Sequence, residues 1–167
     1  MNNNSRRIAV CGVLTALALI FSYIEALIPI PIGIPGVKLG IANIAIIAVI
    51  YIVGDTEAII VNILRIVLTG ILFGNLYSFL FSLAGGMLSV ILMILVKKTK
   101  KLSMVGVSMI GGVAHNVGQI VAAVFLMDNV AIAYYLPILI VAGVITGIVI
   151  GCVCQLATKR IAANFKA

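Results

Sequence analysis

The sequence predicts an all-α, polytopic membrane protein with six transmembrane helices in one bundle. Hydrophobic side chains make up 64% of the 167 residues and charged side chains only 9%, and the mean hydropathy is +1.36. These values lie far outside the range of soluble globular proteins. The apolar residues fall into long runs, and positive charge gathers at alternate boundaries of these runs, as expected of a chain that crosses a bilayer repeatedly.

Charges, prolines and glycines divide the chain into six expected spans. The second and third are short, because about 16 residues at 1.5 Å per residue cover only about 24 Å. Either they cross a thinner part of the bundle or one of them ends in a loop. No polar stretch is long enough for a soluble domain, so we expect one transmembrane domain over residues 1–167. The expected spans are 7–28, 39–54, 57–73, 75–96, 103–127 and 131–157.

The first span carries two distinct faces. It runs on to residue 28 without a clear cleavage site, which predicts a retained helix rather than a signal peptide. Ser22 and Glu25 form a polar face, and small residues form a stripe about 130° away from it. Because small residues allow close helix approach, this stripe is expected to meet a helix of the bundle or of a partner. The stripe consists of Ala9, Gly12 and Ala16.

Residues 29–43, PIPIGIPGVKLGIAN, are the least regular stretch of the chain and contain three of its four prolines. Proline removes a backbone donor and restricts the residue before it, so we expect an ordered loop after the first span. Lys38 lies in this loop. A loop that carries a lysine and caps a helix bundle suggests a lid over a binding site.

The remaining positive charge predicts the orientation. Nine of the eleven Lys and Arg residues precede the first span or follow the fourth and sixth, so six spans place all nine on one face. The positive-inside rule makes this face, and both termini, cytoplasmic. It also explains the net charge of +7 without nucleic acid, which we do not expect as a partner. The acidic turn at 55–57 falls on the same face without a cation of its own.

Arg65 is the charge least expected in its position. It lies about 12 Å into the third span, counted from Glu57, where an arginine costs several kcal/mol unless it faces a cavity or a partner. Either Arg65 binds a ligand or it pairs with Glu25, and both hold if the pair opens when a ligand arrives. Asn62 and Thr69 lie on the same helix stripe as Arg65.

Further polar residues are expected at a similar depth in the outer half of the bundle. GGVAHNVGQ places its histidine and glutamine one turn apart, about 18 and 24 Å from the cytoplasmic end of the fifth span. For the serine and glycine stripes, helix packing is an alternative explanation. We predict one pocket, open to the extracellular side, for a small anionic or amphipathic ligand. Its residues are Lys38, Asn43, Asn62, Arg65, His115, Asn116 and Gln119.

The sequence contains no recognisable catalytic or metal-binding motif. It has two aspartates and no D-D-x-x-D for Mg²⁺, and no G-x-x-x-x-G-K-[ST] for nucleotide hydrolysis. The three cysteines lie in apolar runs far from the single histidine, which argues against zinc. We therefore expect neither catalytic residues nor a metal or other cofactor, and not an enzyme.

Several segments together resemble a known family. ALALIFSYIEALIPIP, PGVKLGIANI, GNLYSFLFSLAGG and GGVAHNVGQ resemble the small bacterial membrane proteins called Gx transporters or heptaprenyl diphosphate synthase component I, over nearly the whole chain. These are similar to the S components of energy-coupling factor (ECF) importers. The resemblance implies a six-helix subunit of the bacterial cell membrane that captures substrate from outside and joins a transmembrane coupling subunit and two ATPases.

The resemblance also implies roles for particular residues. The loop with Lys38 would be the gate, and the small stripe would meet the coupling subunit, although Gly12-x-x-x-Ala16 replaces the usual A-x-x-x-A. The family label suggests an isoprenoid diphosphate as one possible ligand. Three alternatives remain: an accessory subunit that recruits a soluble isoprenoid synthase through KKTKK, a stand-alone transporter with His115 and Glu25 as a proton path, and a purely structural membrane protein.

Overall fold

The structure is a computed structural model that describes residues 3–27, 38 and 40–164, and these residues form helices and no strand. Five of the helices in this part of the chain are long and apolar enough to cross a membrane. The predicted all-α membrane bundle is therefore confirmed. In chain order the elements are α1 (Asn3–Leu27), α2 (Asn43–Ile52), α3 (Asp55–Phe73), α4 (Leu76–Thr99), α5 (Met104–Met127), the 3-10 helix η1 (Val130–Tyr135) and α6 (Leu136–Asn164).

The second helix is shorter than the predicted span 39–54. With 10 residues, α2 is about 15 Å long, roughly half the thickness of the hydrocarbon core. The chain before it turns at Gly40, whose φ of +81° is a left-handed conformation that favours glycine. The second span was predicted to be short, and α2 is shorter still because it begins at Asn43, after the turn at Gly40, rather than at residue 39.

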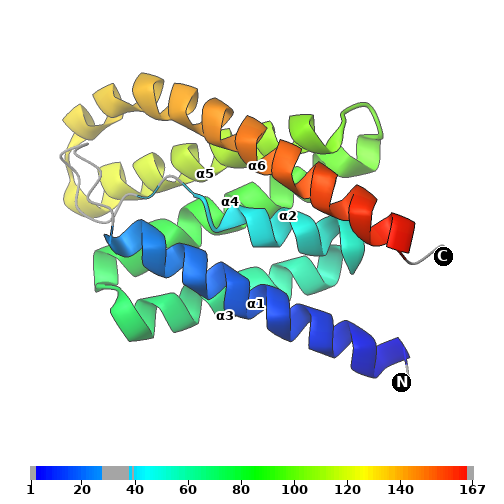
Figure 1. Cartoon of the computed structure of the whole chain (residues 1–167). Coiled ribbons are helices and arrows are strands. Elements are labelled where there is room, and N and C mark those ends of the chain that lie inside the picture. Colours follow the sequence, from blue (N-terminus) through cyan, green and yellow to red (C-terminus); the bar gives the residue numbers. More distant parts are fainter. Residues whose placement is uncertain (1–2, 28–37, 39, 165–167) are drawn as a thin grey trace.

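α2 forms the centre of the bundle. In Figure 1, α2 and α4 lie between α1 and α3 on one side and α5 and α6 on the other, and α2 contacts each of the other α-helices. Its apolar residues point in all directions, as expected of a helix that is buried on most of its surface; only one side, with Ile52 39% exposed, is less buried. Ile46, Ile47, Val49 and Ile50 are fully or almost fully buried.

The last helix begins later and ends later than the predicted span 131–157. α5 ends at Met127, the next residue Asp128 adopts a left-handed conformation (φ 47°), and the chain then forms η1. Pro137 lies in the first turn of α6, where a missing backbone donor costs little. η1 thus occupies the turn in which the sequence predicted the start of a membrane span.

α5 and α6 pack with their backbones almost in contact. A Cβ atom added to Gly147 would lie 2.6 Å from Cα of Met109, and one added to Gly143 would lie 2.8 Å from the carbonyl oxygen of Gly112. Glycines four residues apart on a helix share one face, and this spacing is typical of close helix pairs in membranes. The pair forms the most tightly packed part of the bundle.

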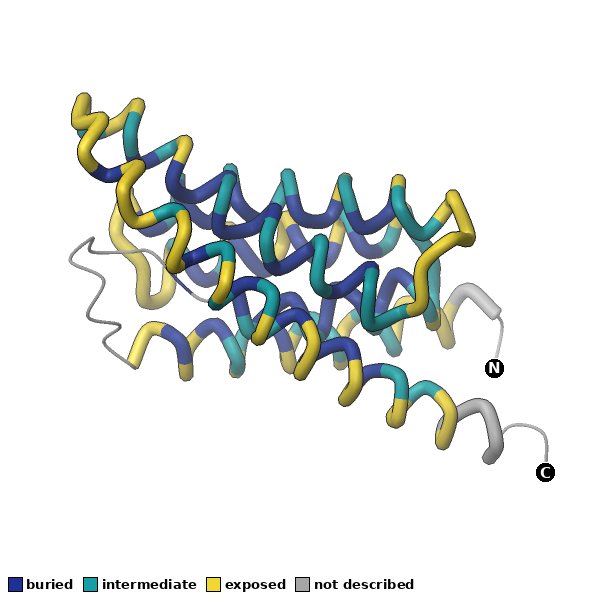
Figure 2. Tube along the Cα trace, turned by 90° about the horizontal axis from the view of Figure 1, so that it is seen from above, coloured by how far each residue is buried: buried dark blue, intermediate teal, exposed yellow. Residues whose placement is uncertain are grey.

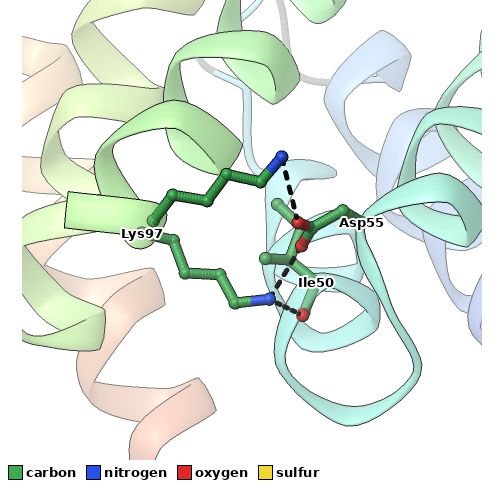
Figure 3. A network of polar contacts seen from close by, with 4 residues as sticks. Ile50, Asp55 and Lys97 are labelled. Atoms are coloured by element: carbon green, nitrogen blue, oxygen red, sulfur yellow. Dashed lines mark hydrogen bonds and ion pairs between the residues drawn. The ribbon is translucent and has the colours of Figure 1, made fainter. Parts of the chain in front are cut away.

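Both termini lie at the same end of the bundle, together with the connection between α4 and α5 (Figures 1 and 2). The acidic turn between α2 and α3 is at this end too and is neutralised by cations from other helices. Arg7 pairs with Glu57, and Nζ of Lys97 donates to Oδ1 of Asp55 at 2.8 Å and to the carbonyl of Ile50 at 2.6 Å (Figure 3). The turn therefore obtains its counter-charges from α1 and α4, across the bundle.

Candidate functional site

A cluster of buried polar side chains separates two apolar parts of the core. Along α4, Phe81 belongs to one apolar cluster and Val90 to the other, and Ser82 and Ser89 are buried between them. Along α5 the same change occurs between Val107 and Ile120. Buried positions follow the inward faces of the helices (Figure 2). The polar residues form a layer across the middle of the bundle, where each needs a hydrogen-bond partner.

Arg65 on α3 lies in this layer and is only 3% exposed. Its Nη2 donates to Oδ1 of Asn62 at 2.8 Å, and its Nη1 donates to Oγ of Ser22 at 3.4 Å. Nε of Arg65 has no hydrogen-bond partner among the described residues. A buried guanidinium normally binds a carboxylate or phosphate, whereas these two partners are neutral.

Glu25 does not form a direct ion pair with Arg65, the alternative to ligand binding that the sequence left open. The ion pairs of the described residues do not include one between these side chains. Oε1 of Glu25 instead accepts the backbone N–H of Ile41 at 2.8 Å. Glu25 thus binds a free backbone donor just before α2, where a negative charge also interacts favourably with the helix dipole.

Gln119 on α5 connects the same segment to His115. Its Oε1 accepts the backbone N–H of Lys38 at 3.0 Å, and its Nε2 lies 2.7 Å from Nε2 of His115. Because the amide oxygen of Gln119 already accepts a bond, its nitrogen donates to His115, which must be neutral with its proton on Nδ1. That nitrogen lies against the Gly85 backbone.

Three glycines allow these side chains to approach one another. A Cβ atom at Gly86 would lie 3.1 Å from Nη2 of Arg65, and one at Gly85 would lie 2.8 Å from Cγ of Gln119. At Gly40 it would lie 3.0 Å from both Nδ2 of Asn43 and the ring of His115. α4 therefore offers only backbone where the polar groups of α3 and α5 converge.

Asn116 is separated from the other predicted residues. Its Nδ2 donates to the carbonyl of Leu139 on α6 at 2.6 Å. Its neighbour His115 instead faces Gln119 and Gly40. Asn116 thus belongs to the contact between α5 and α6, although the sequence grouped it with the pocket.

The cluster contains more donors than its own acceptors satisfy. Within the described part of the chain, Nδ2 of Asn43, Nε of Arg65 and Oγ1 of Thr69 are buried without a partner. Lys38 is only 8% exposed; burial lowers the pKa of its ammonium group, and the nearby Glu25 carboxylate raises it. No group of three or more potential metal ligands occurs among the described residues. The arrangement suits an anion or a hydrogen-bond acceptor.

The structure thus brings most of the predicted site residues together and adds others. Lys38, Asn43, Asn62, Arg65, His115 and Gln119 share the polar layer. Sequence reasoning did not assign Ser22, Gly40, Gly85 or Gly86 to the site; the adjacent glycines within a polar helix stripe were the available signal. The proline-rich segment 29–37 predicted as a lid lies outside the described residues.

The predicted docking stripe borders a groove between α1 and α3. The groove has a volume of about 690 Å³ and is mainly apolar, with Arg7 and Glu57 among its lining residues. Gly12 and Ala16 line it, and a Cβ atom at Gly12 would meet nothing within 4 Å. Ala9 is exposed but is not among the lining residues.

Comparison with known proteins identifies one family. The family model described as heptaprenyl diphosphate synthase component I matches residues 14–157. No curated protein and no solved structure matches the chain. The matched region includes every residue of the polar layer.

Proposed function

Because the chain belongs to the heptaprenyl diphosphate synthase component I family, we propose that this membrane protein is the substrate-binding subunit of an ECF-type importer. In this proposal it binds a small anionic or amphipathic ligand in the polar layer and catalyses no reaction. The observation that carries the proposal is that the buried guanidinium of Arg65 forms no direct ion pair among the described residues and bonds only neutral side chains. A membrane protein keeps such a charge at high cost, and this favours a functional role.

The contacts around Lys38 support a site that opens and closes. Gln119 and Glu25 hold residues 38–42 through two backbone hydrogen bonds, and these residues directly precede α2. Two such bonds contribute about 1–3 kcal/mol in total, which a ligand in contact with Arg65 could replace. We propose that ligand enters here, from the end opposite the two termini, which would be the extracellular side of the bacterial cell membrane.

The groove between α1 and α3 supports a separate surface for protein partners. We propose that a helix of the transmembrane coupling subunit packs along Gly12 and Ala16, and that the ATPase subunits associate through it. The open space at Gly12 would let that helix approach closely. The surface lies outside the polar layer, so substrate binding and partner binding use different residues.

Native mass spectrometry of the purified protein tests the proposed site. We expect the parent to carry a small-molecule adduct that Arg65→Ala loses, because the substitution removes the central donor. Arg160→Ala, an equal change at an exposed position of α6, should keep the adduct. Equal retention by all three proteins would contradict the assignment of Arg65.

A second candidate function follows from the family description itself. In that case the chain is a membrane accessory subunit of isoprenoid biosynthesis that recruits a synthase through its exposed lysines at 98, 100 and 101. Purification from native membranes distinguishes the two. Co-purifying ATPases support the importer, and a co-purifying prenyl synthase supports the accessory subunit.

A further inference from the structure

We propose that the polar layer takes a ligand head group with a single negative charge and several hydrogen-bond acceptors, rather than a diphosphate. This inference rests on the proposed substrate-binding function and specifies its ligand class. It follows from two properties of the described residues, the net charge of the buried cluster and the chemical type of its unpaired atoms.

The buried cluster carries a net charge of one positive unit. Its ionisable side chains are Arg65, Lys38 and Glu25, which are 3%, 8% and 5% exposed. The segment at 28–37 and residue 39, which the structure does not describe, contain no ionisable side chain in the sequence. His115 contributes no charge, because its Nε2 accepts a hydrogen bond from Gln119.

The negative charge of Glu25 balances one of the two positive charges in the cluster. Burial disfavours the ionised carboxylate, but the backbone N–H of Ile41, which donates to Oε1 at 2.8 Å, and the cations of Arg65 and Lys38 favour it. It is also within electrostatic range of both Arg65 and Lys38. One positive charge is therefore left for a ligand.

The unpaired atoms beside that charge are donors. Nε of Arg65 and Nδ2 of Asn43 can only donate, and the hydroxyl of Thr69 can donate. Two further buried polar atoms of the described residues are unpaired: Nδ1 of His115, which carries the proton of the neutral ring and is also a donor, and Oδ1 of Asn116, an acceptor on the residue that bonds α6. A head group rich in acceptors would satisfy these donors, whereas one rich in donors would not.

The balance of charge then selects among anions. A monoanion makes the closed cluster neutral, but a diphosphate would leave an excess negative charge buried at the same place. An uncompensated charge in a low-dielectric interior is costly. The cluster should therefore prefer one charge to two or three on an otherwise identical ligand.

Two probes with the same prenyl chain test this preference. Methyl geranyl phosphate is a diester with one charge, and geranyl phosphate is a monoester with a charge of about −2 above pH 7. Their affinities for the full chain in nanodiscs at pH 8 are measured by titration calorimetry. We expect the parent to bind the diester at least about tenfold more tightly.

Two variants change the charge of the cluster without changing its shape. Glu25→Gln raises the net charge to two while its amide oxygen still accepts the Ile41 N–H, so the preference should reverse in favour of the monoester. Asp128→Asn is the matched control, since it removes an equal charge at an exposed position, and it should behave as the parent. Lys38→Met lowers the net charge to zero and should weaken binding of both esters.

Each alternative result has a defined meaning. Tighter binding of the monoester by the parent would overturn the inference and leave the substrate-binding function intact. If Glu25→Gln folds, as judged by its thermal transition, and keeps the parent's preference, the charge count is wrong. Binding of neither ester by the parent would count against the proposed substrate-binding function. The inference about the ligand's charge would then be wrong as well, because it rests on that function.

Discussion

At the scale of single residues, the polar layer depends on side chains that bond the backbone of another segment. Gln119 and Glu25 both accept N–H groups from residues 38–42, and Ser89 donates to the carbonyl of Gly111 at 2.8 Å. In the membrane interior such backbone groups have no water as an alternative partner. These side chains therefore fix the position of irregular backbone inside a helical bundle.

Gln119→Leu should lower the stability of the protein, although it replaces a buried polar side chain with an apolar one. The substitution leaves the buried N–H of Lys38 without an acceptor and removes the donor to His115, at a cost of about 1–3 kcal/mol. Thermal unfolding in detergent measures the loss. Gln155→Leu, at a partly exposed position of α6, should unfold close to the parent temperature; equal losses in both variants would contradict the role of Gln119.

The sequence could predict which residues are buried and polar but not all of their partners. The depth of Arg65 and the spacing of His115 and Gln119 follow from helix geometry, so their placement in one layer was predictable. The partner of Glu25 was not, because it depends on where the backbone before α2 turns. Asn116 differs from its neighbour His115 by 100° on the helix, and sequence alone could not decide which of the two faces the layer.

At the scale of helices, the two halves of the chain differ in how they pack. α5 and α6 approach through glycines at nearly backbone distance, whereas a groove of about 690 Å³ separates α1 from α3 on the outside. Helix boundaries were predictable wherever a charge or a polar cap ends an apolar run, as at Asn75 before α4 and Ser103 before α5. The start of α2 lies in apolar sequence, and there composition alone predicted a span that begins four residues too early.

Gly147→Ala should destabilise the bundle by about 1–3 kcal/mol, a typical cost of overpacking. The new methyl group would lie 2.6 Å from Cα of Met109 and 2.8 Å from the carbonyl oxygen of Ser108, and these backbone atoms can move only if α5 and α6 separate. Thermal unfolding again provides the measurement. Gly12→Ala is the matched control, since a Cβ atom there meets nothing and alanine favours a helix. A loss at Gly12 as large as that at Gly147 would refute this explanation.

At the scale of the whole molecule, a cluster of ion pairs and two exposed tyrosines lie at opposite ends. Arg7, Glu57 and Lys97 are at the end that holds the termini, while Tyr77 and Tyr134, exposed by 49% and 88%, lie at the start of α4 and in η1. Tyrosines of this kind are typical of the membrane–water interface, and cations are typical of its cytoplasmic side. The structure gives the polarity of the bundle, and the positive-inside rule assigns its direction.

Cysteine labelling in intact cells tests this direction. Ala131→Cys lies on exposed η1 and should react with a membrane-impermeant maleimide from outside, whereas Lys101→Cys, between α4 and α5, should react only after the cells are permeabilised. The parent provides the background, because Cys154 is buried and Cys11 and Cys152 lie within membrane helices. The opposite pattern would place the termini outside. Labelling of both positions from the same side would show that the two ends of the bundle do not face opposite sides of the membrane. The proposed entry of the ligand at the end opposite the termini would then be wrong.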